Sequence, residues 1–282
     1  MTTVIISLRK QFVEFPVPLI MGILNVTPDS FSDGGRHFGL DAARRHADAM
    51  AAAGARIIDV GGESTRPGAR RVDTDEEIDR VIPVIEKIKS ELDVLVSIDT
   101  YKEPVARIAV EEAGADMIND ISALRFSEKM ADTVAELEVP VVLMHIKGTP
   151  EDMQIDPSYA DVIAEIDGYF EERIEFAQSK GIKREKLIID PGIGFGKRLE
   201  DNVAIIRQLN RFDRFELPIL VGLSHKTFLG KISGSQHPED REPETIAASV
   251  LAVQNGAAIL RVHDVAATVK AMAVLSRLME KG

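Results

Sequence analysis

The chain has 282 residues, of which 45% are hydrophobic and 28% are charged, and its formal net charge is −12. This acidic balance argues against nucleic acid or an anionic membrane as a main partner, because either needs a basic surface, although a few local cations could hold one anionic substrate. The complete lack of cysteine excludes disulfides, thiolate catalysis and zinc held by cysteine.

The N-terminal residues 4–15 predict a short β-hairpin, which Pro16 and Pro18 end. No stretch of the chain approaches the roughly 20 apolar residues of a membrane span, and the N-terminus lacks the features of a secretory signal. We therefore expect a cytoplasmic protein whose residues 1–16 form a hairpin cap.

Eight short apolar runs follow the hairpin, and segments with helical character separate them. Continuous runs of Val, Ile and Leu are typical of parallel strands that are covered on both faces. The runs span residues 19–26, 56–62, 94–99, 117–121, 141–146, 187–190, 219–224 and 259–264. Helices are expected at about 40–53, 74–91, 102–113, 127–138, 158–180, 199–211, 241–255 and 266–280. This alternation predicts an α/β fold, a single (β/α)8 TIM barrel that spans residues 1–282 as one domain, with the hairpin over its amino-terminal mouth.

Local signals mark several helix ends. Asp41 and Ser158 are expected to begin two helices, and Thr74 with Glu77 three residues later has the pattern of a capping box. Asp264 is expected to cap the last helix. Glycines that follow helices predict left-handed turns before the next strand. They are Gly54, Gly114, Gly181 and Gly256.

Four polar side chains lie at or just after the ends of predicted strands, where a barrel of this kind assembles its active site. They are Asp99, Asn119, Asp190 and Lys226. Two carboxylates, an amide and an ammonium group suit a flat heterocycle that carries several N–H donors and a carbonyl. For any one of them alone, a structural role as a strand end or helix cap remains open.

Asn25, Arg261 and His263 form a second group, at the ends of the first and eighth strands. Arg261 and His263 flank Val262, so both face the same side of the strand. Arginine with histidine suits an anion such as phosphate, and Asn25 could hold a phosphate oxygen or a Mg²⁺ ion. The alternative is a surface arginine beside a helix-capping segment.

Two long segments rich in Gly, Pro, Ser and Asp follow the first two strands, at 27–40 and 63–73. They are too long for simple connections, which favours binding loops. Their residues of interest are Phe31 and Pro67 as apolar surface, Arg66 as a cation and Asp33 as a group near a phosphate-bound metal.

The glycine-rich segment 191–197 lacks the spacing of a dinucleotide-binding loop. We interpret it as a turn that lets Phe195 flank the pocket. His145, at the end of a predicted strand, is interpreted as a hydrogen-bonded histidine, with a catalytic role as the alternative.

Five motifs together resemble the dihydropteroate synthase family. They are Asn25–Gly35 (NVTPDSFSDGG), Glu63–Ala69 (ESTRPGA), Ser97–Thr100 (SIDT), Asp190–Lys197 (DPGIGFGK) and Arg261–Asp264 (RVHD). The resemblance implies a (β/α)8 barrel that condenses 6-hydroxymethyl-7,8-dihydropterin pyrophosphate with para-aminobenzoate, giving 7,8-dihydropteroate and pyrophosphate in folate biosynthesis. It also implies Mg²⁺ as the cofactor, a homodimer joined through the C-terminal helices, and inhibition by sulfonamides that mimic para-aminobenzoate.

The resemblance further implies a role for particular residues. Pterin binding falls on Asp99, Asn119, Asp190, Lys226, Met144 and Gly222. Pyrophosphate binding falls on Asn25, Thr65, Arg66, Arg261 and His263, with Asn25 also on the metal. Para-aminobenzoate binding falls on Phe31, Pro67, Phe195, Ser224 and Lys226. The catalytic set is Asp33, Asp99, Lys226, Arg261 and His263, and Asp33 joins when its loop closes.

The chain departs from the family pattern at His225, because the family usually has Ser-Arg-Lys where this chain has Ser224-His225-Lys226. A permanent bidentate cation is thereby replaced. We expect a dissociative mechanism, in which departing pyrophosphate is stabilised electrostatically and no protein nucleophile is needed. Two alternatives stay open: a folate-dependent corrinoid methyltransferase that shares the pterin pocket, and a non-catalytic pterin-binding paralogue.

Overall fold

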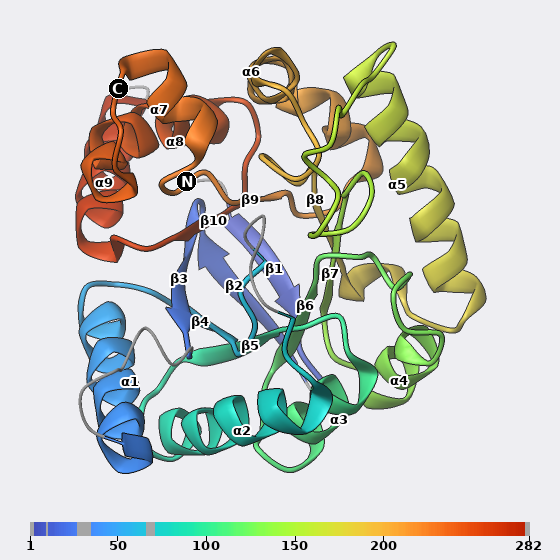
Figure 1. Ribbon diagram of the computed structural model, residues 1–282, viewed down its shortest axis with the longest axis vertical. Coiled ribbons are helices and arrows are strands. Elements are labelled where there is room, and N and C mark those ends of the chain that lie inside the picture. The colour runs from blue at the N-terminus through green and yellow to red at the C-terminus, as the bar shows by residue number, and fades with distance from the viewer. Residues whose placement is uncertain (1–2, 10, 27–34, 66–70, 280–282) are drawn as a thin grey trace.

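The structure is a computed structural model of the chain, and it describes all residues except 1–2, 10, 27–34, 66–70 and 280–282. The side chains of residues 35–38 also lie outside the description. In the described part of the chain, strands and helices alternate around a central barrel (Figure 1).

Eight parallel strands form the barrel, each at the place of a predicted apolar run. They are β3 (Leu19–Asn25), β4 (Ile57–Gly61), β5 (Leu95–Asp99), β6 (Met117–Asp120), β7 (Val141–Met144), β8 (Leu187–Asp190), β9 (Leu220–Val221) and β10 (Ile259–Val262). Hydrogen-bonded neighbours follow the order β8-β7-β6-β5-β4-β3-β10-β9. A parallel bridge between Ile189 and Ile219 joins the two end strands and closes the ring. The predicted (β/α)8 barrel is confirmed.

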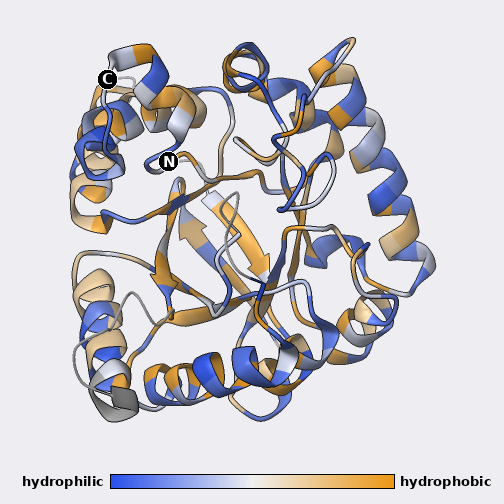
Figure 2. Ribbon diagram, in the orientation of Figure 1, coloured by the Kyte–Doolittle hydropathy of each residue, from blue (hydrophilic) through white to orange (hydrophobic). Residues whose placement is uncertain are grey.

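The strands are buried on both faces, because helices cover the outside and side chains fill the inside. In β4, all five residues are buried. Val60 points outward and shares the main core with Val81 and Ile85 of a covering helix. Ile57 points inward and belongs to the interior of the barrel. Figure 2 shows the result, with hydrophobic strands at the centre and helices of mixed polarity around them.

Helices surround the barrel near most of the predicted positions. The α-helices are α1 (Gly35–Ala52), α2 (Thr74–Glu91), α3 (Glu103–Glu111), α4 (Met130–Leu137), α5 (Val162–Ser179), α6 (Leu199–Arg207), α7 (Thr227–Ser233), α8 (Glu242–Gln254) and α9 (Val265–Met279). Short 3₁₀ turns are η2 (Arg184–Lys186), η3 (Leu209–Phe215) and η4 (Pro238–Arg241). The sequence analysis did not predict α7, because its seven residues are too few to show a periodic pattern.

Two predicted helix starts are wrong. Helix α1 begins at Gly35, upstream of Asp41. Helix α5 begins at Val162 and is capped by Asp161, not by Ser158. The Asp161 side chain accepts two backbone N–H groups of the first helical turn, which otherwise have no partner within the helix.

The predicted capping box of α2 is also wrong. Asp73, one residue before Thr74, caps the helix by accepting the backbone N–H of Glu76 at 2.9 Å. The buried carboxylate of Glu77 pairs instead with Lys102 at 2.5 Å. Glu77 therefore joins α2 to the start of α3.

Other predicted helix ends are confirmed. Asp264 caps α9, since its Oδ1 accepts the backbone N–H of Ala267 at 2.9 Å. The predicted glycines adopt positive φ angles that side chains disfavour. They are Gly54 (111°), Gly114 (83°), Gly181 (91°) and Gly256 (104°).

The N-terminal hairpin closes the amino-terminal end of the barrel. Its strands β1 (Thr3–Ser7) and β2 (Phe12–Pro16) pair antiparallel. Val4 and Ile6 pack into a buried cluster with the first inward-facing residues of the barrel strands. The barrel members of this cluster are Leu19, Met21, Ile57, Met117, Val142, Ile188, Leu220 and Ile259. The hairpin is anchored by Lys186, just before β8, whose Nζ donates to the carbonyl oxygens of Ser7 and Leu8 at 2.9 and 2.7 Å.

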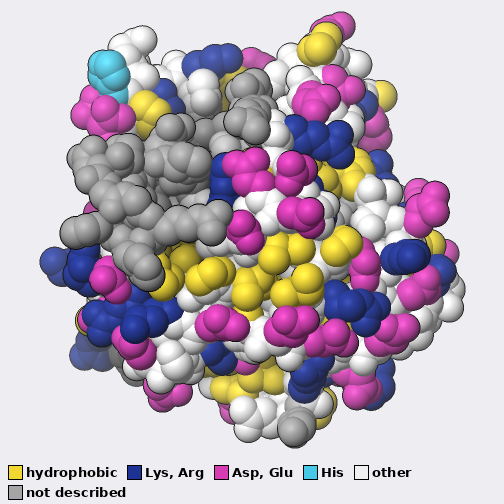
Figure 3. Space-filling model, turned by 60° about the horizontal axis from the view of Figure 1, so that its bottom comes forward, with side chains coloured by type: hydrophobic (Ala, Val, Ile, Leu, Met, Phe, Trp, Pro, Cys, Tyr) yellow, Lys and Arg dark blue, Asp and Glu magenta, His cyan; other side chains and the backbone are white. Residues whose placement is uncertain are grey.

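The molecular surface mixes charges of both signs. On the face shown in Figure 3, acidic and basic side chains are interspersed around a group of hydrophobic side chains. None of the described helices has the length and apolar character needed to cross a membrane.

Candidate active site

The carboxyl ends of four neighbouring barrel strands form one row of paired positions. Asn25 in β3 pairs with Gly61 in β4, Gly61 pairs with Asp99 in β5, and Asp99 pairs with Asn119 in β6. Paired residues of neighbouring strands point their side chains to the same face of the sheet. The row therefore brings Asn25, Asp99 and Asn119 to a single level at the mouth of the barrel.

Arg261, in β10, contacts two carboxylates of other strands. Its Nε donates to Oδ2 of Asp59 at 2.6 Å, and its Nη2 donates to Oδ2 of Asp99 at 2.6 Å. Asp59 lies in β4 and is fully buried, and its Oδ2 also accepts from Nδ2 of Asn119 at 3.0 Å. One network thus links the predicted pterin residues Asp99 and Asn119 to the predicted pyrophosphate residue Arg261.

Burial sets the charge states of this network. Burial raises the pKa of Asp99 to about 7 against the lowering effect of Arg261, and repulsion from Asp59 adds to the rise. Burial alone would lower the pKa of Arg261, but Asp59 and Asp99 outweigh it and hold that pKa above its ordinary value. Near neutral pH, the site therefore holds a permanent cation beside a carboxyl group whose charge depends on pH.

A tight turn after β8 positions Asp190. The backbone N–H of Gly192 donates to Oδ1 of Asp190 at 2.7 Å. Gly192 has a φ of 67°, and a Cβ there would lie 1.9 Å from the carbonyl oxygen of His145, so only glycine fits. Burial raises the pKa of Asp190 to about 6, although the Gly192 N–H opposes the shift. Met144, buried in β7, pairs with Asp190 and lies at the same level.

Lys226 and Phe195 lie against each other on this side of the mouth. Nζ of Lys226 is 4.4 Å from the centroid of the Phe195 ring, which is a cation–π geometry. Phe195 also packs onto a small apolar cluster that contains Met144. At Gly222, an added Cβ would meet no atom within 4 Å, so the space beside it is open. The turn that follows Asp190 thus places the apolar ring of Phe195 against the ammonium group of Lys226.

Ser224 holds His263, just after β10. Oγ of Ser224 lies 2.9 Å from Nδ1 of His263 and accepts the backbone N–H of the same residue at 3.2 Å. The ring of His225 stacks on that of His263, with centroids 4.8 Å apart and planes at 4°. Nε2 of His225 lies 3.2 Å from Oε2 of Glu242. The position usually occupied by arginine therefore contributes an imidazole layered on His263.

Comparison with known proteins agrees with these features. The sequence profile of a family described as "Pterin binding enzyme" matches residues 21–263. The dihydropteroate synthase of Escherichia coli (strain K12) is 50% identical over 259 residues, which are 92% of this chain and 90% of that protein. The chain belongs to the dihydropteroate synthase family. This membership confirms the predicted family, the enzyme class and the role in folate biosynthesis.

Solved dihydropteroate synthase structures have the same fold. The Xanthomonas albilineans dihydropteroate synthase with 4-aminobenzoic acid has a TM-score of 0.93 and 46% identity, covering 100% of both chains. The same organism's dihydropteroate synthase in complex with 7,8-dihydropteroate has a TM-score of 0.89 and 44% identity, covering 99% of this chain and 100% of that one. These relatives carry the name of the synthase, not that of the corrinoid methyltransferase considered above.

Part of the synthase loop motifs lies outside the described residues. Phe31 and Asp33 belong to the first loop, and Arg66 and Pro67 belong to the second. Their roles remain predictions from the resemblance. Thr65 is the last described residue before the gap in the second loop and is half-buried.

Half-buried charges hold the base of the second synthase loop. Nζ of Lys102 donates to Oε2 of Glu63 and to the carbonyl oxygen of Val72, each at 2.6 Å. The hydroxyl of Tyr101 donates to Oε1 of Glu63 at 2.6 Å. Because Glu63 and Val72 flank the loop that carries Thr65, the two ends of this loop are fixed.

His145 is a hydrogen-bonded core residue of the synthase fold, as interpreted from the sequence. Its Nδ1 lies 2.9 Å from Nζ of Lys197, and Lys197 also donates to the carbonyl oxygen of Phe195 at 3.0 Å. Burial, followed by the charge of Lys197, lowers the pKa of His145 to about 2. Burial also lowers the pKa of Lys197 to about 7. The pair supports the turn that presents Phe195.

The sequence analysis missed three charged residues near the synthase site, of which Asp59 and Lys197 are buried and Lys102 is half-buried. Asp59 lies inside an apolar run, and its only signal is a charge at an inward position two residues before Gly61. Lys102 closely follows the SIDT motif, and Lys197 ends the DPGIGFGK motif. Their proximity to motifs is visible in the sequence, but their partners are not.

The described residues supply part of the ligand set that the expected Mg²⁺ ion would need. Across the described ranges, no group of three or more His, Asp or Glu side chains could hold a metal. Asn25, half-buried at the end of β3, offers one amide oxygen. Mg²⁺ commonly keeps several waters and binds through one or two protein groups together with substrate phosphates. A pyrophosphate substrate would therefore have to supply part of its coordination.

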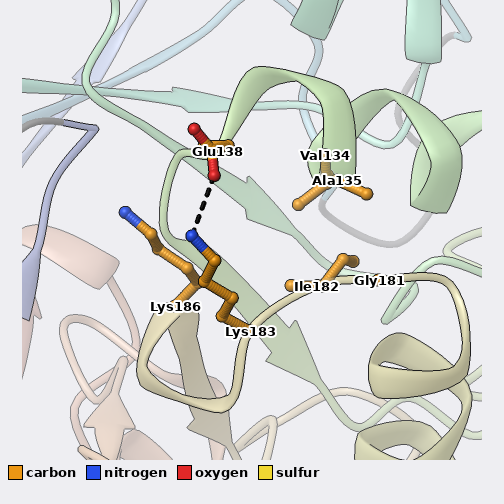
Figure 4. A pocket seen from close by; sticks show the side chains of 7 residues that line it. All are labelled: Val134, Ala135, Glu138, Gly181, Ile182, Lys183 and Lys186. Carbon is orange, nitrogen blue, oxygen red and sulfur yellow. Dashed lines mark hydrogen bonds and ion pairs between the residues drawn. The ribbon is translucent and has the colours of Figure 1, made fainter.

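A shallow hollow elsewhere on the protein is separate from the synthase site. Figure 4 shows its lining side chains, which come from α4 and from the segment before β8. At its edge, Lys183 pairs with Glu138 at 2.9 Å. Lys186 also lines the hollow and holds the hairpin at the amino-terminal end of the barrel. Since active sites of this fold lie at the opposite end, the hollow takes no part in the chemistry.

Proposed function

We propose that the chain condenses 6-hydroxymethyl-7,8-dihydropterin pyrophosphate with para-aminobenzoate by a dissociative mechanism. The observation that supports this proposal is the placement of Arg261 between Asp59 and Asp99, in one network with Asn119. Asp99 and Asn119, which can hydrogen-bond a heterocycle, thereby lie beside Arg261, a permanent cation that can bind an anionic group. A substrate that carries both parts, such as a pterin pyrophosphate, matches this arrangement.

The pterin ring would lie among the polar side chains at the strand ends. Its polar partners would be Asp99, Asn119, Asp190 and Lys226. The ring N–H and amino groups would donate to the carboxylates, and the amide can both donate and accept. Met144, Phe195 and the open space beside Gly222 would accommodate the faces of the ring. Analogues that lack these N–H groups would leave buried carboxylates unpaired and would be rejected.

The pyrophosphate would lie at the rim of the same pocket. Its partners would be Asn25, Thr65, Arg66, Arg261 and His263. The two bonds that hold Arg261 fix its guanidinium before substrate arrives, so its charge acts without reorganisation. A bound Mg²⁺, with Asn25 as a ligand, would supply further positive charge to the leaving group.

As the carbon–oxygen bond breaks, the dihydropterin ring would delocalise the positive charge of its methylene carbon. Asp99 and Asp190 would stabilise that charge, and no protein nucleophile takes part. Closure of the first loop would bring Asp33 to the reacting carbon and exclude water. The amine of para-aminobenzoate would then attack the methylene carbon and form the new carbon–nitrogen bond, and the nitrogen would lose its extra proton to the departing pyrophosphate or to water.

Para-aminobenzoate would approach from the side of the mouth where Lys226 lies over Phe195. Its partners would be Phe31, Pro67, Phe195, Ser224 and Lys226. The aromatic and proline surfaces suit a planar ring, and the ammonium group of Lys226 suits its carboxylate. His225 would contribute an imidazole near this end in place of an arginine.

A direct assay tests the proposed function. Purified protein is incubated with Mg²⁺, the pterin pyrophosphate and radiolabelled para-aminobenzoate. We expect labelled dihydropteroate and pyrophosphate in equal amounts, and competition between a sulfonamide and para-aminobenzoate. Binding of the pterin pyrophosphate without any labelled product would instead identify a non-catalytic paralogue.

We also infer a cytoplasmic homodimer joined through the C-terminal helices α8 and α9. Leu251, Val274 and Leu278 on these helices are exposed by 41%, 62% and 78%. Large apolar side chains exposed on adjacent helices are typical of a partner interface. Sedimentation equilibrium should give twice the chain mass of 30.9 kDa, and Val274→Glu should give the single mass.

A further inference from the structure

Asp59 lies beneath the proposed pterin site, where it has no contact with solvent and yet contacts two site residues. We propose that Asp59 is a positioning residue that couples Asn119, at the pterin end of the site, to Arg261, at the pyrophosphate end. The inference rests on the proposed function for the identity of the two ends. The contacts themselves do not depend on it.

A single oxygen atom of Asp59 makes both contacts. Its Oδ2 accepts from Nε of Arg261 at 2.6 Å and from Nδ2 of Asn119 at 3.0 Å. The two donors come from β10 and β6, which lie two strands away from β4 on either side (Figure 1). A movement of either donor therefore changes the geometry available to the other through the shared acceptor.

Asp59 and Asp99 play different parts in holding Arg261. Two hydrogen bonds to two carboxylates fix the plane of the guanidinium. The Asp59 side chain is fully buried, whereas that of Asp99 is 10% exposed and ends its strand at the mouth. Asp99 can accept a substrate N–H in addition to the N–H of Arg261, while Asp59 keeps the arginine in place.

Stability alone does not account for the burial of Asp59. Its Oδ1 is buried without a hydrogen-bond partner among the described residues, and so is Oγ of Ser97, at the paired position of β5. A buried carboxylate with an unpaired oxygen destabilises a fold. The contribution of Asp59 is therefore to the geometry of the site.

Asp59 also shapes the electrostatics around Asp99. Burial raises the pKa of Asp99, and the charges of Asp59, of Glu77 on α2 and of Asp120 on β6 add to the rise, against the attraction of Arg261 on β10. Removal of the Asp59 charge would lower the pKa of Asp99. The Asp99 carboxylate would then persist to lower pH.

The variant Asp59→Asn tests the proposal, because it keeps the size of the side chain and one acceptor oxygen but removes the charge. Calorimetry with inorganic pyrophosphate and Mg²⁺ should show an increase of about tenfold in the dissociation constant. The kcat/KM for pterin pyrophosphate should fall by about the same factor, while the KM for para-aminobenzoate stays within about twofold. The acid limb of the kcat/KM profile should move to lower pH.

Ser97→Ala is the matched control. Ser97 is as buried as Asp59, pairs with it in the next strand and also has an unpartnered oxygen, but no described hydrogen bond joins it to Arg261 or Asn119. We expect pyrophosphate binding and the pH profile of this variant to equal those of the wild type. Wild-type pyrophosphate binding and an unshifted profile in Asp59→Asn would overturn the proposal.

A double-mutant cycle tests the coupling even where Asp59→Asn does not fold. Asn119→Ala, Arg261→Lys and their combination are titrated with inorganic pyrophosphate. If the shared oxygen couples the two residues, the fold-change in the dissociation constant of the double variant should differ by about threefold or more from the product of the two single fold-changes. A double variant whose fold-change equals that product would overturn the proposal. These titrations need no turnover, so a failure of the coupling is distinct from a failure of the proposed function, which the condensation assay reports.

Discussion

The two ends of the barrel are built from the same eight strands and differ in chemistry. At the amino-terminal end, inward side chains such as Ile57, Met117 and Ile188 pack with Val4 and Ile6 of the hairpin into an apolar cluster. At the carboxyl end, the strands carry polar and charged side chains instead. They include Asp59, Asp99, Asn119, Asp190 and Arg261. Asp59 lies only two positions after Ile57 in the same strand, about 7 Å along it.

The difference shows how one set of strands supports both stability and chemistry. Apolar contacts at the closed end lower the free energy of the fold and depend little on pH. At the open end, Oδ1 of Asp59 and Oγ of Ser97 are buried and have no hydrogen-bond partner in the part of the chain that the structure describes, an arrangement that lowers stability. Substitutions at the closed end should therefore change the free energy of unfolding, and those at the open end should change catalysis.

The largest expected effect is that of Asp99→Asn at the open end. Loss of a charged acceptor for the pterin N–H groups should lower kcat/KM for pterin pyrophosphate by about 10³-fold. The free energy of unfolding should change by less than about 1 kcal/mol, because Arg261 keeps its ion pair with Asp59 and the asparagine can still accept its hydrogen bond. Steady-state kinetics and urea denaturation measure the two quantities. Normal turnover in this variant would refute the assignment of Asp99 to the pterin site.

Ile188→Ala tests the closed end, where we expect a change in stability and none in catalysis. The cavity that it leaves should lower the free energy of unfolding by about 2–5 kcal/mol, while kcat/KM at 25 °C stays within about twofold. Ile188→Val is the control, with an expected loss of about 1 kcal/mol. A loss of catalysis that matches the loss of stability would break the proposed separation of the two ends.

The pH dependence of kcat/KM for pterin pyrophosphate should come from the open end. Burial raises the pKa of Asp99 to about 7 and that of Asp190 to about 6. As the pH falls through these values, each carboxylate takes up a proton and stops accepting a pterin N–H. We expect kcat/KM to fall about tenfold per pH unit between about pH 7 and 6, where Asp99 is protonated, and about a hundredfold per unit well below pH 6, where Asp190 is protonated as well. A flat profile between pH 5 and 8 would contradict this origin.

His225→Arg should have the smallest effect. The substitution places a permanent cation beside His263, where His225 now stacks at 4.8 Å. We expect the KM for pterin pyrophosphate to fall about threefold, with kcat nearly unchanged. His225→Phe keeps a stacked ring without its nitrogens and serves as the control. Identical constants in all three proteins would show that this position contacts neither substrate.

The barrel strands could be predicted in place, with starts within about one residue and ends within about three, because continuous apolar runs in a strand–helix alternation have few other interpretations. The run at 141–146 and strand β7 both begin at Val141. Helix starts were less predictable, since Ser158 and Asp161 are both suitable caps and tertiary packing decides which one begins α5. Helix α7 was not predictable from periodicity, because it has only seven residues.

The site could be predicted where a polar residue ends an apolar run. Asp99, Asn119 and Asp190 stand out in the sequence for this reason. Asp59 does not, because it lies within a run, and its partners are 60 and 202 positions away. A shared acceptor oxygen is a property of the folded barrel, which no local pattern reports.

The most direct test of the account is a crystal structure of the protein with pterin pyrophosphate bound. The account predicts the pterin ring between Asp99, Asn119 and Asp190, and the pyrophosphate against Arg261 and His263. A ring bound elsewhere on the barrel, or a pyrophosphate remote from Arg261, would contradict it.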